Sequence, residues 1–436
     1  MRWQRLLLES ALASIGTNCH LPLITAFATK AVETGKEHLA SLDSLRGVGV
    51  ILIFANHFIE PTHYIFFGWI GLWIFFSLSG YLITDGLMKM KTLPGRQYFG
   101  RFYAKRAFRI LPALLVFFII SVGLYFAFPR WLAGGPTLGR LWVYLVTFTF
   151  NYHPLEVSGG FWFNHLWSLS LEEQFYAVWP WLIFFLPRNW LKKVAASWIL
   201  VTPALRLIVH SLYGDLAQTT AVVHASLLCQ ADAFAVGACV AIFRDELLRE
   251  SKKLLWIMTT AVIAIGFVNY FAGASAVGPY WRTLGWPHLP HSYLGQFNHG
   301  YVWGYSIINM WAAVLILSCL QGAAPSILNF PPLVFLGRIS YGAYLSHFPL
   351  LGVYLYYLKP INAFSVRGFV IFLIWFANVV IVSWFSFRFL EVPFLRIKNR
   401  LGGTQRTAIS VAPRFKAVPE KRGWGETGRP SSESSG

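Results

Sequence analysis

Ten apolar segments, each close to the length needed to cross a lipid bilayer, follow one another along this chain of 436 residues. A segment of about 20 apolar residues that enters hydrocarbon must satisfy its backbone hydrogen bonds internally, as an α-helix does. Hydrophobic residues make up 56% of the chain and charged residues only 12%, about half the charged share of a soluble domain. We therefore expect an all-α, polytopic membrane helix bundle with about ten transmembrane helices, over residues 44–60, 67–85, 110–128, 168–186, 194–211, 225–243, 254–273, 302–320, 334–356 and 367–389.

An eleventh apolar run, residues 141–150, is too short to cross a bilayer unaided. Charge indicates how to count it, because cytoplasmic loops of membrane proteins are enriched in Lys and Arg. Ten spans place most of the 36 Lys and Arg residues inside, whereas an eleventh span would invert every later loop and put the basic tail outside. We expect this run to be re-entrant or to lie at the outer surface. Both termini are then cytoplasmic, in a multi-pass protein of the cell (inner) membrane.

The net charge of +18 is spread between the apolar segments, so it indicates membrane topology and no nucleic-acid partner. Residues 1–40 are expected to form an N-terminal cytoplasmic extension and residues 41–395 the membrane domain. Residues 396–436 are polar, basic and rich in Gly, Ser and Pro, which predicts a disordered cytoplasmic tail. The four cysteines have no metal-ligand spacing, and we expect no metal site.

The first apolar segment carries a basic residue at its entrance, Arg46, and an imidazole 11 positions later, His57. Apart from Asn56, the residues between them are apolar or small. On a helix the pair would span about 16 Å, roughly half of the hydrocarbon core. An ionisable group at that depth is costly, which indicates a functional residue. The alternative is a histidine that reaches the far interface.

The segment from Leu87 to Arg109, expected as a cytoplasmic loop, holds seven Lys and Arg residues and no acidic residue. Arg106 and Arg109 are three positions apart, so they share one face of a helix that enters the third span. Two guanidiniums on one face form a good receptor for phosphate oxygens. The alternative is that these residues only anchor the topology.

Two adjacent carboxylates, Glu172 and Glu173, stand near the start of the fourth span, which the topology places at its outer end. On a helix Ser168, Glu172 and Tyr176 align, while Glu173 points about 100° away. One carboxylate can therefore face the bundle, where it could orient a histidine or share its proton, while the other meets water. We take Glu172 as a candidate catalytic residue and Ser168, Glu173 and Tyr176 as possible supporting residues. The alternative is that the pair caps the N-terminus of the helix.

Three further polar residues stand in apolar surroundings. His347 is a second imidazole within a predicted span, and we take it as a possible supporting residue of the site. Asp232 and Glu391 are expected to serve packing or helix termination. None of the three is predicted to be catalytic.

Together, six segments resemble the acyltransferase 3 family of integral-membrane O-acyltransferases, in the order typical of that family. The resemblance covers about residues 41–395. One departure is visible, because a basic residue often stands two positions before the family's aspartate, whereas Gln230 precedes Asp232 here; this puts a salt bridge at Asp232 in doubt. The six segments are Leu42–Gly47 with His57 beyond it, Phe75–Ile83, Arg106–Pro112, Leu166–Tyr176, Ile339–His347 and Glu391–Pro393.

The resemblance implies transfer of an acyl group, usually acetyl, from cytoplasmic acyl-CoA to a hydroxyl of a carbohydrate or glycolipid, often on the outer side of the membrane. It implies that His57 is the central catalytic residue and that Arg46, Arg106 and Arg109 bind the donor. Acyl-CoA is then a co-substrate, and no permanently bound cofactor is expected. His57 could act as a general base or be acylated itself.

A transporter or permease of a carbohydrate or an anion is the alternative class. Secondary carriers usually consist of two halves with matching interrupted helices. The sequence shows no such internal repeat.

Overall fold

The computed structural model describes residues 40–59, 67–127, 138–152, 163, 165–214, 216–247, 249, 251–277, 300–321, 326–358, 362 and 364–401. Within these ranges all regular structure is helical, so the all-α expectation is confirmed. The predicted N-terminal extension, apart from Ala40, and the tail after Leu401 lie outside the described residues.

The longer helices of the described residues are α3 (Ala40–Ile59), α4 (Ile70–Met90), α5 (Gly95–Ala127), α7 (Leu166–Phe185), α8 (Arg188–Tyr213), α10 (Leu227–Ile242), α12 (Ser251–Val277), α14 (Gly300–Leu320), α16 (Ser340–Leu358) and α17 (Val366–Ser386). The shorter ones are α6 (Leu138–Thr147), α9 (Leu216–Ala225), α11 (Arg244–Leu247), α15 (Pro331–Arg338) and α18 (Val392–Leu401). A π-helical turn, Phe387–Glu391, joins α17 to α18 without a break.

Six helices in the described part of the chain are long and apolar enough to cross a membrane. They are α3, α4, α5, α8, α14 and the continuous helix that begins with α17. Helices also occupy the four other expected segments, as α7, α10, α12 and α16. Among these four, α10 is apolar but has only 16 residues, and α7 carries Glu172 and Glu173.

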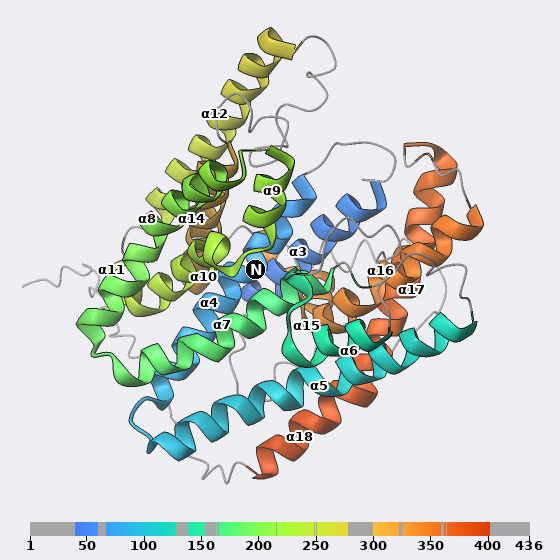
Figure 1. The fold of residues 1–436 in the computed structure, drawn as a ribbon, viewed down its shortest axis with the longest axis horizontal. Coiled ribbons are helices and arrows are strands. Elements are labelled where there is room, and N and C mark those ends of the chain that lie inside the picture. The colour runs from blue at the N-terminus through green and yellow to red at the C-terminus, as the bar shows by residue number, and fades with distance from the viewer. Residues whose placement is uncertain are drawn as a thin grey trace, which may run out of the picture.

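Helix α3 joins two hydrophobic cores. Figure 1 shows α16 and α17 on one side of it, and α8, α10, α12 and α14 on the other. The larger core is built mainly from α4, α5, α7, α8, α10 and α14, and it includes Leu45 of α3. The smaller core packs α3 against α15, α16 and α17, and it includes Phe54. The helix that carries Arg46 and His57 is therefore fixed on both sides.

Two glycines bring α3 and α15 into backbone contact. A Cβ atom at Gly337 would lie 1.8 Å from the Asp43 carbonyl oxygen, and one at Gly47 would lie 2.2 Å from the Leu333 carbonyl oxygen. Only a residue without a side chain permits such an approach. The expectation of one span over residues 334–356 is wrong, because the helix breaks at Ile339. Gly337 holds α15 against α3, and α16 then starts separately.

The basic segment expected as a loop is mostly helical. Helix α5 begins at Gly95 and continues through Pro112 to Ala127, so the arginines and the third apolar segment belong to one helix. The short run at residues 141–150 forms the ten-residue helix α6 and part of a 3₁₀ turn. A helix of that length reaches only about 15 Å, too short to cross. The last helix continues to Leu401, beyond the expected domain limit at residue 395.

Candidate active site

Two imidazoles from distant parts of the chain meet in the smaller core. His57 lies in the last turn of α3, and His347 lies in the second turn of α16. His57 Nδ1 is 3.1 Å from His347 Nε2, which is a hydrogen-bond distance. His347 is fully buried, whereas His57 is partly exposed. His57 is thus the member of the pair that a substrate could reach.

Aromatic rings hold the imidazole pair in place. Phe54, one turn before His57, stacks on His347 with ring centroids 4.8 Å apart and planes 17° from parallel. Phe348 meets the His57 ring edge-on, with centroids 4.5 Å apart. Trp375 of α17 donates its Nε1 hydrogen to the His347 carbonyl oxygen at 3.3 Å. These contacts leave each ring little freedom to turn.

A third imidazole, His165, completes the cluster, and the sequence reasoning did not assign it a role. Its ring centroid is 5.2 Å from that of His347, and it stacks on Phe348 at 9°. His165 is 4% exposed, and neither ring nitrogen has a hydrogen-bond partner among the described residues. In the sequence, His165 is recognisable only by its position, just before the polar start of an apolar segment. Sequence spacing cannot show that α7 brings it to α16.

Tyr344 fixes the start of α7 to α16. Its hydroxyl donates to the His165 carbonyl oxygen and lies 3.1 Å from Ser168 Oγ. Ser168 also donates to the His165 carbonyl, at 3.1 Å. The predicted site residue Ser168 therefore supports the backbone beside the histidines.

Glu172 lies in a chain of hydroxyl groups on the predicted face of α7. Tyr176 donates its hydroxyl hydrogen to Glu172 Oε2 at 2.9 Å, which confirms the expected alignment of these two residues. Because that hydrogen is used, Ser79 donates to the Tyr176 oxygen, at 2.5 Å. Glu173 Oε1 is buried and has no hydrogen-bond partner in the described ranges. The expectation that Glu173 meets water therefore does not hold for this oxygen.

Three arginines act electrostatically on Glu172. Its carboxylate interacts with Arg106, Arg109 and Arg46, in that order of strength. The guanidinium of Arg106 also lies over the Tyr176 ring, 5.1 Å from its centroid. Glu172 was predicted at the outer end of its span, and the structure adds that its electrostatic neighbours are arginines of α3 and α5. Along α7 it lies six positions, about 9 Å, after the first residue of the helix.

Two carboxylates from neighbouring segments, those of Asp43 and Glu391, also interact with these arginines. Asp43 lies 3.6 Å from Arg46 and 3.3 Å from Arg338, so one carboxylate bridges α3 and α15. Arg109 interacts electrostatically with Glu391 of the π-helical turn. Glu391 is 4% exposed, and its Oε1 has no hydrogen-bond partner within the described part of the chain. Glu391 was expected to serve packing or helix termination, and its interaction with Arg109 was not predicted.

Most of the predicted site residues, together with His165, form two groups. The histidine group contains His57, His165 and His347, and the arginine group contains Arg46, Arg106, Arg109 and Glu172. Helix α3 contributes to both groups, with Arg46 and His57 about 16 Å apart along its axis. A cationic site and a base at that separation suit a long substrate with an anionic end and a reactive end.

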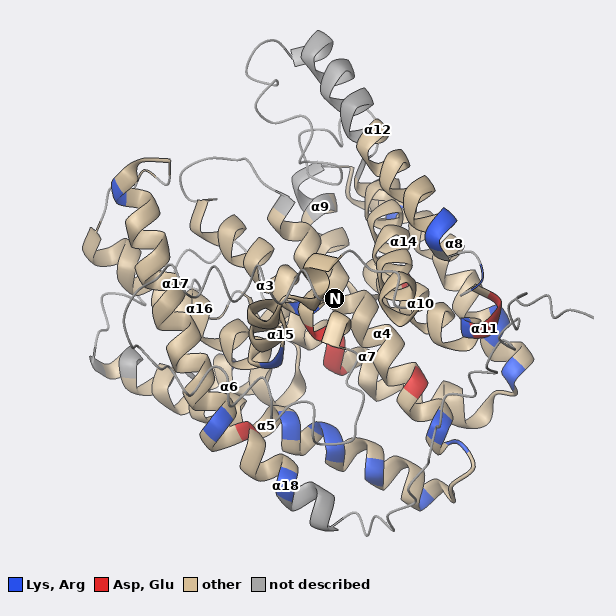
Figure 2. Ribbon diagram, turned by 180° about the vertical axis from the view of Figure 1, so that it is seen from behind, with Lys and Arg blue, Asp and Glu red and all other residues tan. Residues whose placement is uncertain are grey.

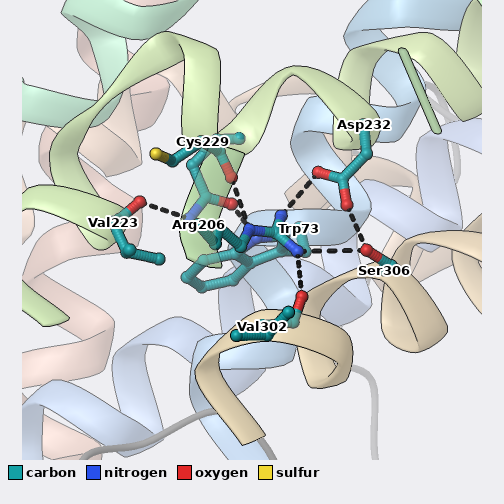
Figure 3. A network of polar contacts seen from close by, with 8 residues as sticks. Trp73, Arg206, Val223, Cys229, Asp232, Val302 and Ser306 are labelled. Carbon is teal, nitrogen blue, oxygen red and sulfur yellow. Dashed lines mark hydrogen bonds and ion pairs between the residues drawn. The ribbon is translucent and has the colours of Figure 1, made fainter. Parts of the chain in front are cut away.

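A separate polar network ties α8, α10 and α14 together (Figure 3). The side chain of Arg206 is fully buried and lies 2.7 Å from Asp232 Oδ1. It also donates to the carbonyl oxygens of Cys229 and Val302, both at 2.7 Å, and to Ser306 Oγ at 3.0 Å. Figure 3 shows these partners converging on the guanidinium. The doubt about a salt bridge at Asp232 is resolved, because its partner comes from α8.

Gln230, which stands where a basic residue is often found, has another partner. Its Oε1 accepts from Trp73 Nε1 at 2.8 Å, and its Nε2 donates to the Val223 carbonyl oxygen at 2.9 Å. Both polar ends of this buried side chain are therefore satisfied. The residue joins α10 to α4 and α9.

Arg206→Gln should lower the free energy of unfolding by about 3–5 kcal/mol, because it leaves the buried Asp232 carboxylate without its countercharge. The measurement is thermal unfolding in detergent. Lys192→Gln is the matched control, since it removes a contact to exposed Glu246 and should change stability little. An Arg206→Gln protein as stable as the wild type would show that the network does not support the fold.

A family model described as an acyltransferase domain matches residues 39–388. The peptidoglycan O-acetyltransferase OatA of Listeria monocytogenes is 26% identical over 379 residues, which cover 82% of this chain and 56% of that protein. The O-acetyltransferase OatA of Staphylococcus aureus is 26% identical over 408 residues, covering 86% of this chain and 61% of that protein. No solved structure gave a significant match.

A third relative is the putative peptidoglycan O-acetyltransferase YrhL of Bacillus subtilis, 26% identical over 328 residues. The match covers 72% of this chain and 49% of that protein. The chain therefore spans about half to three fifths of the length of these relatives.

Proposed function

Because the chain belongs to the acyltransferase 3 family, we propose that it is a membrane O-acetyltransferase that moves an acetyl group from cytoplasmic acetyl-CoA to a carbohydrate hydroxyl of the cell envelope. One observation carries the proposal: α3 presents Arg46 to a group of arginines and, 11 residues later, His57 to a group of histidines. The names of the relatives support an acetyl group and an envelope carbohydrate.

The arginine group suits the anionic end of the donor. Coenzyme A carries phosphates at one end and its thioester at the end of a long, flexible arm. Guanidiniums bind phosphate oxygens through planar, charge-assisted hydrogen bonds. With the phosphates at Arg46, Arg106 and Arg109, the arm would run beside α3 towards His57. Glu172 lies among these arginines and would hold them in position while the site is empty.

The histidine group suits the chemistry of transfer. His57 would take the proton from the acceptor hydroxyl as its oxygen attacks the thioester carbon. The carbon–sulfur bond then breaks, and the coenzyme A thiolate leaves with that proton. A route through an acetylated His57 uses the same arrangement in two steps, with the imidazole nitrogen as first nucleophile. In either route the acetyl group crosses while the coenzyme stays on the cytoplasmic side.

The transporter alternative is set aside because the relatives reported above are named as acetyltransferases. The names of the relatives support the identity of the acceptor less directly, because this chain spans only part of the relatives' length. We propose a cell-envelope carbohydrate, and peptidoglycan is the first acceptor to test.

The proposed function is tested on the cell envelope. We expect a deletion strain to lose O-acetyl groups from a surface carbohydrate, and a plasmid copy of this chain to restore them. Mass spectrometry of purified peptidoglycan and of the other surface glycans measures the change, with a His57→Ala copy as the control. Unchanged O-acetylation of every glycan in the deletion strain would refute the proposal.

We also propose ten membrane spans with both termini in the cytoplasm. Figure 2 supports this, because Lys and Arg gather along α5 and around α11 and α18. In the ten-span arrangement the basic first part of α5, together with α11 and α18, lies at the cytoplasmic surface, where basic residues are enriched. The ten-residue helix α6 is not counted as a span.

Cysteine labelling tests this topology. In a variant without native cysteines, Arg96→Cys and Gly402→Cys should react with a membrane-impermeant reagent only from the cytoplasmic side. Pro290→Cys should react only from outside. Labelling of position 402 from outside would show that residues 138–150 do cross and that every later loop is inverted.

A further inference from the structure

The two nitrogens of His347 have different partners, and this determines where its proton lies. Nδ1 is 2.6 Å from the Tyr344 carbonyl oxygen and 3.2 Å from that of Ala343. A carbonyl oxygen can only accept a hydrogen bond, so His347 Nδ1 must carry hydrogen. In the neutral ring, Nε2 is then a lone-pair acceptor. That nitrogen is the one that faces His57.

The charged form of His347 is unfavourable where the ring lies. Its side chain is fully buried and is packed by Phe54 and Phe348. The polar rings beside it, those of His57, His165 and Tyr344, offer no negative charge. A buried cation without a countercharge costs several kcal/mol, so the neutral ring is favoured.

It follows that the hydrogen between the two rings belongs to His57. His57 Nδ1 donates to His347 Nε2 at 3.1 Å, the ring centroids are 5.2 Å apart and the ring planes are 13° from parallel. Because the centroids are farther apart than the two nitrogens, the rings lie edge to edge, and the N–H of one can point at the lone pair of the other. A neutral imidazole has one hydrogen, so His57 Nε2 carries the free lone pair.

We propose that His347 is a positioning residue that holds the hydrogen of His57 on Nδ1, so that Nε2 is the nitrogen that receives the proton of the acceptor hydroxyl. The role of Nε2 in transfer rests on the proposed function, whereas the tautomer itself does not. In Ser-His-Asp enzymes a carboxylate performs this task for the catalytic histidine. Here a neutral imidazole, oriented by two backbone carbonyls, occupies the corresponding place.

The same arrangement accommodates the charge that develops during transfer. When Nε2 takes the hydroxyl proton, His57 becomes an imidazolium, and its Nδ1 hydrogen bond to His347 strengthens. The carbonyl oxygens of Tyr344 and Ala343 lie at the far nitrogen of His347, where their dipoles favour positive charge. As the carbon–sulfur bond breaks, Nε2 returns the proton to the thiolate, and both rings are neutral again. The acceptor loses one proton, and coenzyme A gains it.

Nitrogen-15 NMR of the histidines in bilayer-reconstituted, ¹⁵N-histidine-labelled protein tests the tautomer directly. We expect His57 to show a protonated Nδ1 and an unprotonated Nε2, with its signals identified by their absence from His57→Gln protein. A wild-type His57 that carries its hydrogen on Nε2 would overturn the proposal. This measurement needs neither donor nor acceptor, so it stands apart from any failure of the proposed function.

Two substitutions of His347 test the link to transfer. His347→Gln can place its amide oxygen near the former Nε2 position and should keep kcat within about tenfold of the wild type. His347→Leu offers no acceptor, and kcat should fall on the order of a hundredfold or more. The KM for acetyl-CoA should stay within about twofold in both, because the donor arginines are untouched. Equal kcat values in folded Gln and Leu variants would refute the positioning role.

Discussion

Replacing His57 with alanine should abolish acetyl transfer while leaving the protein folded in the membrane. Loss of a general base slows a reaction by about 10²–10⁴-fold, and loss of an acylated nucleophile removes its route entirely. His57 is partly exposed at the end of α3, so its removal opens no large cavity in either core. The measurement is turnover of acetyl-CoA by purified protein with a soluble carbohydrate acceptor.

Ile51→Ala is the matched control for this variant. Ile51 lies on the same helix, but its side chain is 38% exposed and it belongs to neither core. The control should transfer acetyl groups at close to the wild-type rate. Turnover by folded His57→Ala protein at that same rate would end the catalytic assignment of His57.

Replacing both Arg106 and Arg109 with glutamine should raise the apparent dissociation constant of acetyl-CoA by on the order of a hundredfold or more. Each hydrogen bond to a charged group contributes about 1.5–3 kcal/mol, and two are removed. Lysine at both positions should restore only part of the affinity, because a point charge cannot reproduce the planar guanidinium. Titration of acetyl-CoA against the detergent-solubilised protein at fixed ionic strength measures the effect.

The control for the double variant removes the same charge from the same helix. Arg96 and Arg101 are exposed on α5, outside the group around Glu172. Arg96→Gln with Arg101→Gln should change donor affinity only slightly, through the general positive potential. An equal loss in both double variants would show that Arg106 and Arg109 act as ordinary topology anchors.

The helices and the catalytic candidate could be predicted because their signals are local. A run of apolar residues identifies a membrane helix wherever it packs, and the apolar residues around His57 are its immediate neighbours in the sequence. The helical start of α5 could also have been predicted from its residue types, although it was not. Arg, Gln and Lys favour helices, but the basic residues before Arg109 were assigned to a loop because the apolar pattern had not yet begun.

The partners of the candidate residues could not be predicted, because they come from distant segments. His57 and His347 are 290 positions apart, and no local pattern indicates that α3 and α16 meet. The same holds for Arg206, which lies within the apolar segment 194–211 and whose partner, Asp232, comes from α10. Glu172 was expected beside a histidine, yet its neighbours are arginines from α3 and α5.

The length of α3 has a consequence for donor choice. One helix separates the cationic group from the imidazole by about 16 Å, and both of its sides are fixed by packing. A donor must therefore bridge that gap to bind by its phosphates and still present its acetyl group to His57. Acetyl phosphate joins the same acetyl group directly to a phosphate, so it can occupy one end of α3 but not both. If the proposed donor site is correct, the protein would select its donor by reach as well as by charge.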